Sequence, residues 1–416
     1  MSEWKEVQLK DVVSILGDGL HGTPEYSNDG DYYFINGNNF SQGSIVINDD
    51  TKRVSHSEYL KYKKELNDRT LFVSINGTLG NVAYYKGEKV VLGKSACYFN
   101  LLDNVDKRFI RYMLSTPYFK NYVQTYANGT TIKNVSLKSM REFPFKIPIL
   151  LKEQKQIADI ISCLDNKIDN LRRQNETLET IAQTLFKHWF IDFEFPNDDG
   201  KPYKSSGGAM VASELGDIPE GWRVGKLGEE VETVGGGTPS TTEPSYWENG
   251  DIYWYSPTDL TKSKTVFSLD TSKKITKLGL DKSSARLFPK YSILMTSRAT
   301  IGEVTINTNY ACTNQGFITL IPNSLFDTFY LFCWLKTQLT KVNLLASGST
   351  FPELSKSDFR NFDFLIPSNH LVLGFRELVT PLFLRIETNT KQIQTLTKTR
   401  DALLPKLMSG QIRVKD

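Results

Sequence analysis

One stretch constrains this chain more than any other. Between residues 157 and 189, apolar residues recur at alternating spacings of four and three, a rhythm typical of a helix that buries a narrow seam against a second helix. Neither proline nor glycine occurs between Ile149 and Phe195. The pattern therefore predicts a helix of roughly 35 residues, about 50 Å long. Such a helix is suited to spacing two domains, and its seam needs a partner helix.

The partner helix is predicted near the C-terminus, where the same rhythm returns. The predicted seam comprises Ile157, Ile161, Leu164, Ile168, Leu171, Asn175, Leu178, Leu185, Leu382, Ile386, Asn389, Ile393, Leu396, Leu403 and Leu407. Each half of the chain places one asparagine in this seam, at different levels of the repeat, and a buried asparagine commonly sets register at some cost in stability. The alternative is two amphipathic helices packed on separate local cores, but their length and matched rhythm favour pairing.

The residues before the first helix alternate short apolar runs with turn residues, which indicates strands. The expected strands are 32–35, 71–75, 81–85, 90–92 and 143–147. Apolar residues at helical spacing predict one helix over 106–118. The first region is therefore expected to be a mixed domain with much sheet and a few helices.

The second half of the chain repeats the first. Trp222 follows the pattern around Trp4, and Thr238-Pro239 stands where Thr23-Pro24 stood before. The predicted segments are a first domain (1–150), a first spacer helix (151–192), an exposed linker (193–212), a second domain (213–369) and a second spacer helix (370–416). The expected fold class is α+β: two mixed, sheet-rich domains separated by two long antiparallel coiled-coil helices, with an internal pseudo-two-fold repeat.

Composition excludes several classes of protein. The 416 residues carry a net charge of +3, which permits a nucleic-acid partner without requiring one. No signal peptide or long apolar span is apparent, so a cytoplasmic protein is expected. The four cysteines and four histidines are scattered, which argues against zinc or disulfide frameworks. Cys163 lies in the first long helix and is expected to be a buried thiol.

Motifs that carry catalysis are missing from the sequence. Gly93-Lys94-Ser95 lacks the first glycine of a phosphate loop. Gly235-Gly236-Gly237 precedes Thr-Pro and not a helix, so an ordinary turn is the better interpretation. We find no Gly-x-Ser-x-Gly or His-Glu-x-x-His sequence. The chain is therefore expected to be non-catalytic, with no metal site of its own.

At this point the order of motifs resembles a known family. The Gly-Gly-Gly-Thr-Pro-Ser turn, the Tyr246–Trp254 segment, the Ala346-Ser-Gly-Ser-Thr loop and the closing Leu403–Ile412 segment are individually weak signals. Their order and their repetition along nearly the whole chain are similar to the specificity (S) subunit of Type I restriction-modification systems.

The resemblance implies a function and a set of partners. Each globular part would be a target-recognition domain that reads one half of a bipartite double-stranded DNA sequence, with the helices as a ruler between the halves. The helices would also dock two methyltransferase (M) subunits, and restriction (R) subunits would complete the complex. S-adenosylmethionine, ATP and Mg²⁺ would belong to those partners. Pro381 and the differing levels of the two seam asparagines depart from a perfect repeat and leave helix length and register open.

Candidate DNA-contacting residues come from loops that the two halves share. Lys, Arg, Ser and Thr suit phosphates, whereas Arg, Lys, Asn and Gln suit base edges. The candidates for the phosphate backbone are Thr23, Thr131, Lys133, Thr238, Ser349 and Thr350. Equivalent positions that differ chemically are candidates for sequence choice: Asn76 against Arg298, and Lys94 against Asn314. The competing interpretation is that all of these satisfy their own turns. Tyr246, Trp247 and Trp254 are expected to be core aromatics.

Two other functions stay open at this point. A two-headed protein-interaction scaffold would have the same helices and would be indifferent to DNA. An unrecognised nuclease would need an acidic or metal cluster, which the sequence does not supply.

Overall fold

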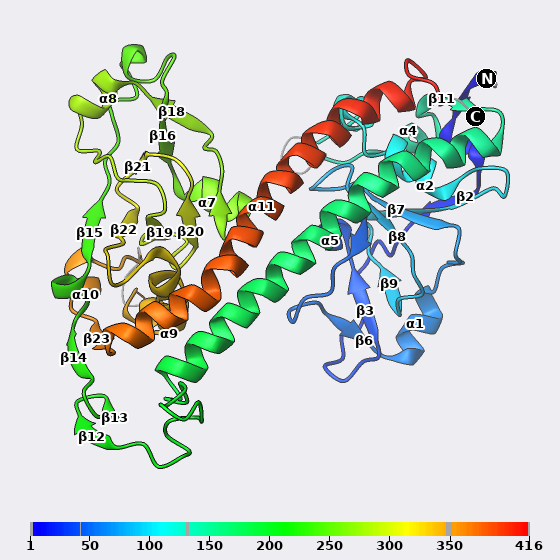
Figure 1. Ribbon diagram of the computed structural model, residues 1–416. Helices are drawn as coiled ribbons and strands as arrows, with labels where there is room; N and C mark the ends of the chain where they lie inside the picture. The colour runs from blue at the N-terminus through cyan, green and yellow to red at the C-terminus, as the bar shows by residue number, and fades with distance from the viewer. Residues whose placement is uncertain (1–2, 42, 130–132, 347–351, 415–416) are drawn as a thin grey trace. The chain divides into compact units, whose positions relative to one another are not determined.

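The computed structural model describes residues 3–41, 43–129, 133–346 and 352–414 (Figure 1). Contacts divide the chain into two compact units: unit 1 comprises Met1–Ile168 and Thr395–Asp416, and unit 2 comprises Asp169–Gln394. The dividing points fall inside the two longest helices, α5 (Leu151–Phe190) and α11 (Asn369–Met408). Each unit therefore contains a part of both helices, whereas the sequence analysis gave each helix a segment of its own.

Unit 1 is built on a four-stranded sheet of order β2-β10-β7-β8 and a three-stranded sheet of order β6-β3-β9. The pairs β1-β11 and β4-β5 accompany them. The strands are β1 (Trp4–Gln8), β2 (Val13–Asp18), β3 (Tyr32–Ile35), β4 (Phe40–Ser41), β5 (Ser44–Ile45), β6 (Arg53–Val54), β7 (Thr70–Ser74), β8 (Val82–Tyr84), β9 (Val90–Leu92), β10 (Ala96–Leu101) and β11 (Pro144–Pro148). The helices of this unit, besides its part of α5 and α11, are α1 (His56–Tyr62), α2 (Lys107–Met113), α3 (Pro117–Thr125) and α4 (Leu137–Arg141).

Unit 2 repeats this plan with a five-stranded sheet, β15-β22-β19-β20-β17, and a three-stranded sheet, β18-β16-β21. Its strands are β12 (Met210–Ser213), β13 (Gly216–Pro219), β14 (Arg223–Lys226), β15 (Glu232–Gly235), β16 (Ile252–Tyr255), β17 (Phe267–Ser268), β18 (Lys273–Ile275), β19 (Ile293–Thr296), β20 (Val304–Asn307), β21 (Ala311–Thr313), β22 (Phe317–Ile321) and β23 (Asp363–Ile366). Its shorter helices are α6 (Leu227–Glu230), α7 (Pro257–Ser263), α8 (Lys277–Asp281), α9 (Thr328–Ala346) and α10 (Lys356–Arg360).

The two units share most of their strands, although β4-β5 in unit 1 and β12-β13 and β17 in unit 2 have no counterpart. The outer pair β1-β11 corresponds to β14-β23, and β2-β10-β7-β8 corresponds to β15-β22-β19-β20. In each three-stranded sheet the middle strand pairs antiparallel on one side and parallel on the other, as β3 does with β6 and β9 and as β16 does with β18 and β21. The predicted α+β fold with an internal repeat is therefore confirmed.

The helix predicted over 106–118 is in fact two helices. Asp106 caps α2 by accepting hydrogen bonds from two backbone N–H groups. The chain then leaves the helix after Met113, and Thr116 caps a new helix whose first residue is Pro117. Proline has no N–H to donate and is tolerated only in the first turn of a helix, so the two helices cannot be one. In unit 2 the equivalent region has no such proline, and α9 continues for 19 residues.

Every predicted seam position of α5 and α11 is buried or half-buried. In unit 1 the buried Ile157, Ile161 and Leu407 share one core with the sheets. In unit 2 the core contains Ala182, Phe186 and Trp189 of α5 together with Phe375 and Ile386 of α11. Cys163, however, is exposed. It lies on the helix face away from the seam, so the expected buried thiol is wrong.

The two seam asparagines meet inside unit 2. Asn389 Nδ2 donates to Asn175 Oδ1 over 2.9 Å, and Asn389 is fully buried. Their levels differ in the repeat, but antiparallel pairing brings them face to face. The same register, continued one turn along each helix, sets Leu171 opposite Ile393. The two asparagines, which break the repeat at different levels, therefore contact each other, and each helix places an apolar residue at the level one turn away.

The predicted linker is mostly exposed, but it begins and ends in packed structure. Phe195 is buried and its ring stacks on Trp222 with centroids 5.2 Å apart. Tyr203 stacks on the other side of Phe195 at 4.5 Å. The antiparallel pair β12-β13 follows, an element that the sequence analysis did not predict. These contacts fix the point at which the second domain begins.

Candidate nucleic-acid interface

In unit 2, three loops gather at one end of the five-stranded sheet because neighbouring antiparallel strands begin and end there. These loops follow β15, follow β19 and precede β22. Gly237 N donates to Thr313 O at 2.8 Å, and Ser297 N donates to Gly316 O at 2.8 Å. The Thr238 hydroxyl donates to Gln315 Oε1 at 2.7 Å. We call this group of loops the unit 2 loop cluster.

Unit 1 has the same arrangement at the corresponding end of its four-stranded sheet. Leu20 N donates to Leu92 O at 2.7 Å, and Ile75 N donates to Ser95 O at 3.0 Å. Lys133 O accepts from Gly77 N at 3.1 Å. The loops after β2, after β7 and before β10 thus form the unit 1 loop cluster. In both units, segments far apart in sequence converge as a result of strand pairing.

Most of the predicted DNA-contacting residues lie in these two clusters. Lys94 and Lys133 are exposed in unit 1, where Thr23 is also exposed and Asn76 is half-buried. In unit 2, Thr238 and Arg298 are exposed and Asn314 is half-buried. Thr131, Ser349 and Thr350 lie outside the described residues. The convergence is consistent with one interface per unit, but the role of each residue stays a prediction.

Some of these side chains already have partners. Arg298 Nε donates to Glu353 Oε1 at 2.7 Å, with both side chains nearly half exposed. Asn314 Oδ1 accepts from Gly316 N at 2.9 Å within its own loop. Asn314 therefore has a turn-satisfying role, as the competing interpretation expected, while its side-chain N–H groups are still available as donors. Arg298 could contact DNA only by sharing or leaving Glu353.

The turn between β19 and β20 contains a backbone conformation that is unfavourable for its residue. Ala299 has a φ of 61°, whereas unit 1 has Gly77 with a φ of 74° at the equivalent position. A residue with a Cβ atom in this left-handed region costs roughly 1 kcal/mol or more. Such strain is often found at functional sites, and here it holds Arg298 and Thr300 at the exposed tip of the turn.

The sequence analysis missed a strongly basic stretch in unit 2. Between residues 262 and 290 there are eight Lys or Arg residues and only two acidic residues, Asp270 and Asp281. The equivalent stretch of unit 1, residues 42–68, has five of each sign. Counting charges over windows, and not over the whole chain, would have found this difference. A basic surface of this kind is typical of contact with phosphates.

Trp247 connects the basic stretch to the unit 2 loop cluster. Its Nε1 donates to Ser240 O at 2.9 Å, and its ring meets Trp254 edge-on at 5.1 Å. Trp254 is buried, as expected, but Trp247 and Tyr246 are only half-buried. Trp247 is therefore not a core residue. Lys273 Nζ lies 5.3 Å from the centre of its ring.

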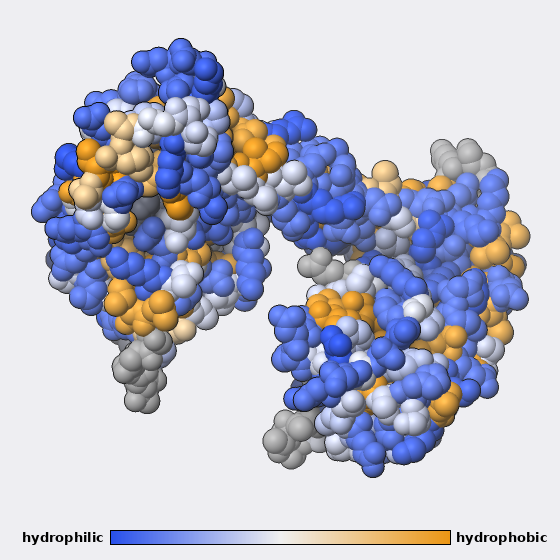
Figure 2. Space-filling model, turned by 90° about the horizontal axis from the view of Figure 1, so that it is seen from below, coloured by the Kyte–Doolittle hydropathy of each residue, from blue (hydrophilic) through white to orange (hydrophobic). Residues whose placement is uncertain are grey.

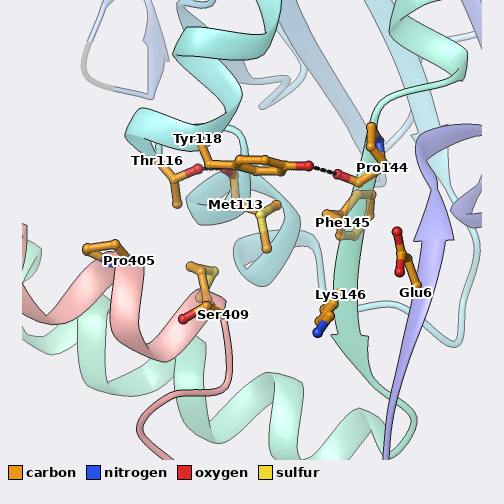
Figure 3. Close-up of a pocket in the computed structure, with 10 residues that line it drawn as sticks. Glu6, Met113, Thr116, Tyr118, Pro144, Phe145, Lys146, Pro405 and Ser409 are labelled. Carbon is orange, nitrogen blue, oxygen red and sulfur yellow. Dashed lines mark hydrogen bonds between the residues drawn. The ribbon is translucent and has the colours of Figure 1, made fainter.

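Unit 1 contains an apolar cavity of about 280 Å³ between β11, the α2–α3 region and the end of α11 (Figure 3). Met113, Phe145 and Met408 line it, with Glu6 and Lys146 at its polar side. Tyr118 closes over it and donates its hydroxyl proton to Pro144 O at 3.0 Å. The lining is unsuited to a phosphate or a base, so this cavity is separate from the loop cluster.

The described residues offer little for catalysis. They contain no group of three His, Cys, Asp or Glu side chains placed to hold a metal ion. Burial raises the pKa of the Cys312 thiol to about 12, and it also raises that of Cys97 and Cys333. A protonated thiol is a poor nucleophile. Within the same residues, no helix is both long and apolar enough to cross a membrane.

Comparison with known proteins identifies the class to which this fold belongs. The Type I restriction modification DNA specificity domain matches residues 1–180 and again 219–370. The chain therefore belongs to the family of specificity subunits of Type I restriction-modification systems, and the resemblance in the sequence is confirmed.

Individual relatives agree with this assignment. The Type I restriction enzyme MjaIX specificity subunit of Methanocaldococcus jannaschii is 29% identical over 100% of this chain and 94% of its own length. The HindI specificity subunit of Haemophilus influenzae is 27% identical over 72% of this chain and 75% of its own length. A crystal structure of a Type I restriction-modification S subunit from M. genitalium shares the fold, with a TM-score of 0.59, 19% identity and coverage of 98% and 96% of the two chains.

Proposed function

We propose that this chain is the non-catalytic DNA-reading subunit of a Type I restriction-modification complex, and that each unit reads one half of a bipartite target. The observation that carries the proposal is the pair of equivalent loop clusters on one repeated frame. At equivalent positions the clusters present different chemistry: Asn76 against Arg298, and Lys94 against Asn314. Asparagine suits adenine and arginine suits guanine, so two such clusters would select different bases.

The helices are proposed to dock two M subunits, as the resemblance implies. Several large apolar side chains on α5 and α11 are more than a third exposed: Ile160, Ile181, Leu373, Leu378 and Leu384. These residues lie outside the seam, and exposed apolar surface of this kind commonly marks a protein interface. S-adenosylmethionine, ATP and Mg²⁺ are proposed to bind the M and R subunits.

The space-filling view is consistent with separate polar and apolar surfaces. Each unit is mainly hydrophilic on the face shown, with smaller hydrophobic patches between the polar regions (Figure 2). Polar surface suits DNA, whose interfaces are more polar and more positively charged than those between proteins. The apolar patches suit protein partners.

The direct test is to co-express the chain with an M subunit encoded beside it in a host without methylation, and to map N6-methyladenine over the host DNA. We expect methylation in a motif with two specified parts and a fixed unspecified gap. Exchanging residues 1–150 for those of another family member should change one part only. A change in both parts would contradict the assignment of one half-site to each unit. An active complex whose methylation pattern is independent of this chain would favour the scaffold function instead.

A further inference from the structure

The basic stretch of unit 2 contains a hollow whose lining is suited to an anion. Thr241, Trp247, Ser272, Lys273 and Lys274 surround about 360 Å³ of open space at the edge of the three-stranded sheet. Two lysines, two hydroxyl-bearing residues and one tryptophan thus line the same space. Ammonium and hydroxyl groups are hydrogen-bond donors of the kind that bind an anion.

The two lysines are held by the sheet and by aromatic rings. β18 is an edge strand, paired with β16 so that Lys274 lies opposite Tyr253 and Lys273 lies opposite Trp254. Lys274 Nζ lies 4.2 Å from the centre of the Tyr253 ring, and Lys273 Nζ lies above Trp247. Cation–π contacts of this length hold an ammonium group in place, and Lys274 is also paired with the Asp270 carboxylate at 3.9 Å.

The loop before β18 is also fixed. The Asp259 carboxylate accepts from Ser272 N at 2.9 Å and from both the N–H and the hydroxyl of Ser256. Burial alone would raise the pKa of Asp259, but these hydrogen bonds lower it. Asp259 therefore stays charged. It does not line the hollow, but it fixes the backbone of Ser272, the residue before Lys273.

Unit 1 repeats the cation and the ring at the equivalent place. The Arg53 guanidinium lies 5.0 Å from the centre of the Tyr33 ring, across the β3-β6 pair. Because the contact occurs in both units, the shared fold places a cation at this edge of the sheet. Unit 1 also has a lysine before this cation, Lys52, so unit 2 differs in the surrounding basic residues and not in Lys273 itself.

We propose that the hollow beside Trp247 binds a backbone phosphate of duplex DNA. This inference rests on the proposed function, and it adds a contact that carries no sequence information. Residues 238–242 connect the hollow to the unit 2 loop cluster, since Ser240 O accepts from Trp247 while Thr238 contacts Gln315. A duplex read by the loops would therefore have its backbone beside Lys273 and Lys274.

The test uses the complete complex with its M subunits and a duplex that contains the methylated motif. The affinity of the wild type is compared with that of the double variant Lys273→Gln, Lys274→Gln between 50 and 200 mM salt. Each phosphate contact contributes nearly one unit to the slope of log affinity against log salt. We therefore expect the loss of affinity over this fourfold range of salt to be about 3.5-fold smaller in the variant. The methylated motif should stay the same.

A matched control is Lys277→Gln, Lys282→Gln, which removes the same charge from the first residue of the neighbouring helix α8 and from its C-cap. Lys277 is paired with Asp281 at 2.8 Å. An equal change of slope in both variants, or no change in the first, would overturn the phosphate site while leaving the proposed function intact. A changed motif would overturn it too, because it would place the lysines at base edges. Wild-type complex without any sequence-dependent methylation would instead contradict the proposed function itself.

Discussion

Units 1 and 2 share a frame and differ in what they place on it. The order and pairing of the shared strands and the converging loops are the same, although unit 2 adds β17 to its larger sheet. The differences lie in exposed charge, with the basic stretch in unit 2 only, and in how each domain is joined to the helix pair. The shared features are those that burial and backbone pairing demand. Recognition can therefore vary on the surface without a change of fold.

The join between domain and helices is stronger in unit 1. The Asp165 carboxylate of α5 accepts from Tyr112 at 3.0 Å, from Arg111 at 3.2 Å and from Arg400 of α11 at 2.9 Å. In unit 2 the described residues are tied by an ion pair, Lys336 with Glu179 at 3.2 Å, and by a hydrogen bond that the Tyr291 hydroxyl donates to Glu387 of α11 at 3.2 Å. Removing each tie is the first way to test the comparison.

Asp165→Asn is expected to have the largest effect, a loss of about 3 kcal/mol in the stability of unit 1. It leaves the poorly exposed Arg111 guanidinium without its charge partner, and Arg111 Nε already lacks a hydrogen-bond partner among the described residues. Arg400 keeps its second partner, Asp401, at 2.8 Å. Hydrogen exchange of the unit 1 sheet amides measures the loss. Glu179→Gln, read out on the unit 2 sheet, should cost about 1 kcal/mol or less. Equal losses in the two units would contradict the comparison.

The cavity of unit 1 has a filled counterpart in unit 2. Met113 lines the cavity, whereas the equivalent Trp334 is buried against Phe364 with ring centroids 5.0 Å apart. Trp334→Met should cost about 2 kcal/mol by leaving a void. Met113→Trp should stabilise unit 1 by about 1 kcal/mol by filling one. Thermal unfolding of the two variants checks the opposite signs, and a loss of stability in both would show that the unit 1 cavity is too rigid to accept the ring.

The asparagine pair belongs to unit 2 alone and can be removed in two steps. Asn175→Leu leaves the buried Asn389 amide without its partner and should cost about 2 kcal/mol. The double variant Asn175→Leu, Asn389→Leu should recover most of that loss, because both partners become apolar. Denaturant unfolding of the wild type, the single variants Asn175→Leu and Asn389→Leu, and the double variant measures the coupling. If the two single effects simply add, the side chains do not interact in solution.

The smallest expected effect concerns the turn at Ala299. Ala299→Gly should stabilise unit 2 by about 1 kcal/mol, since glycine adopts a positive φ without strain. Gly77→Ala should destabilise unit 1 by a similar amount, although nothing lies within 4 Å of the added Cβ. Thermal unfolding with the methylation motif as a second readout separates stability from function. An unchanged melting temperature for Ala299→Gly would show that the turn relaxes in solution.

Much of the architecture could be predicted from the sequence because periodicity reports burial directly. β3 and β9 match their predicted ranges residue for residue, and every predicted seam position is buried or half-buried. The prediction failed where a polar residue interrupts a buried strand. β10 is buried along all six residues and was missed, because Asn100 breaks the continuous apolar run that marks the equally buried β7 and β9. Its Asn100 looks out of place until Thr70 and Glu65 are seen to satisfy it.

For the interface, the sequence by itself determined which loops the two halves share and where they differ. It also determined that two long helices pair and that the chain is a repeat, because a seam and a duplication are patterns along one dimension. Only the tertiary structure decided that Asn175 faces Asn389, that Arg298 is held by Glu353 and that Trp247 lies under Lys273. These pairs are far apart in the chain, and strand and helix register brings them together. Register is set by the packing of the whole unit, which no local stretch encodes.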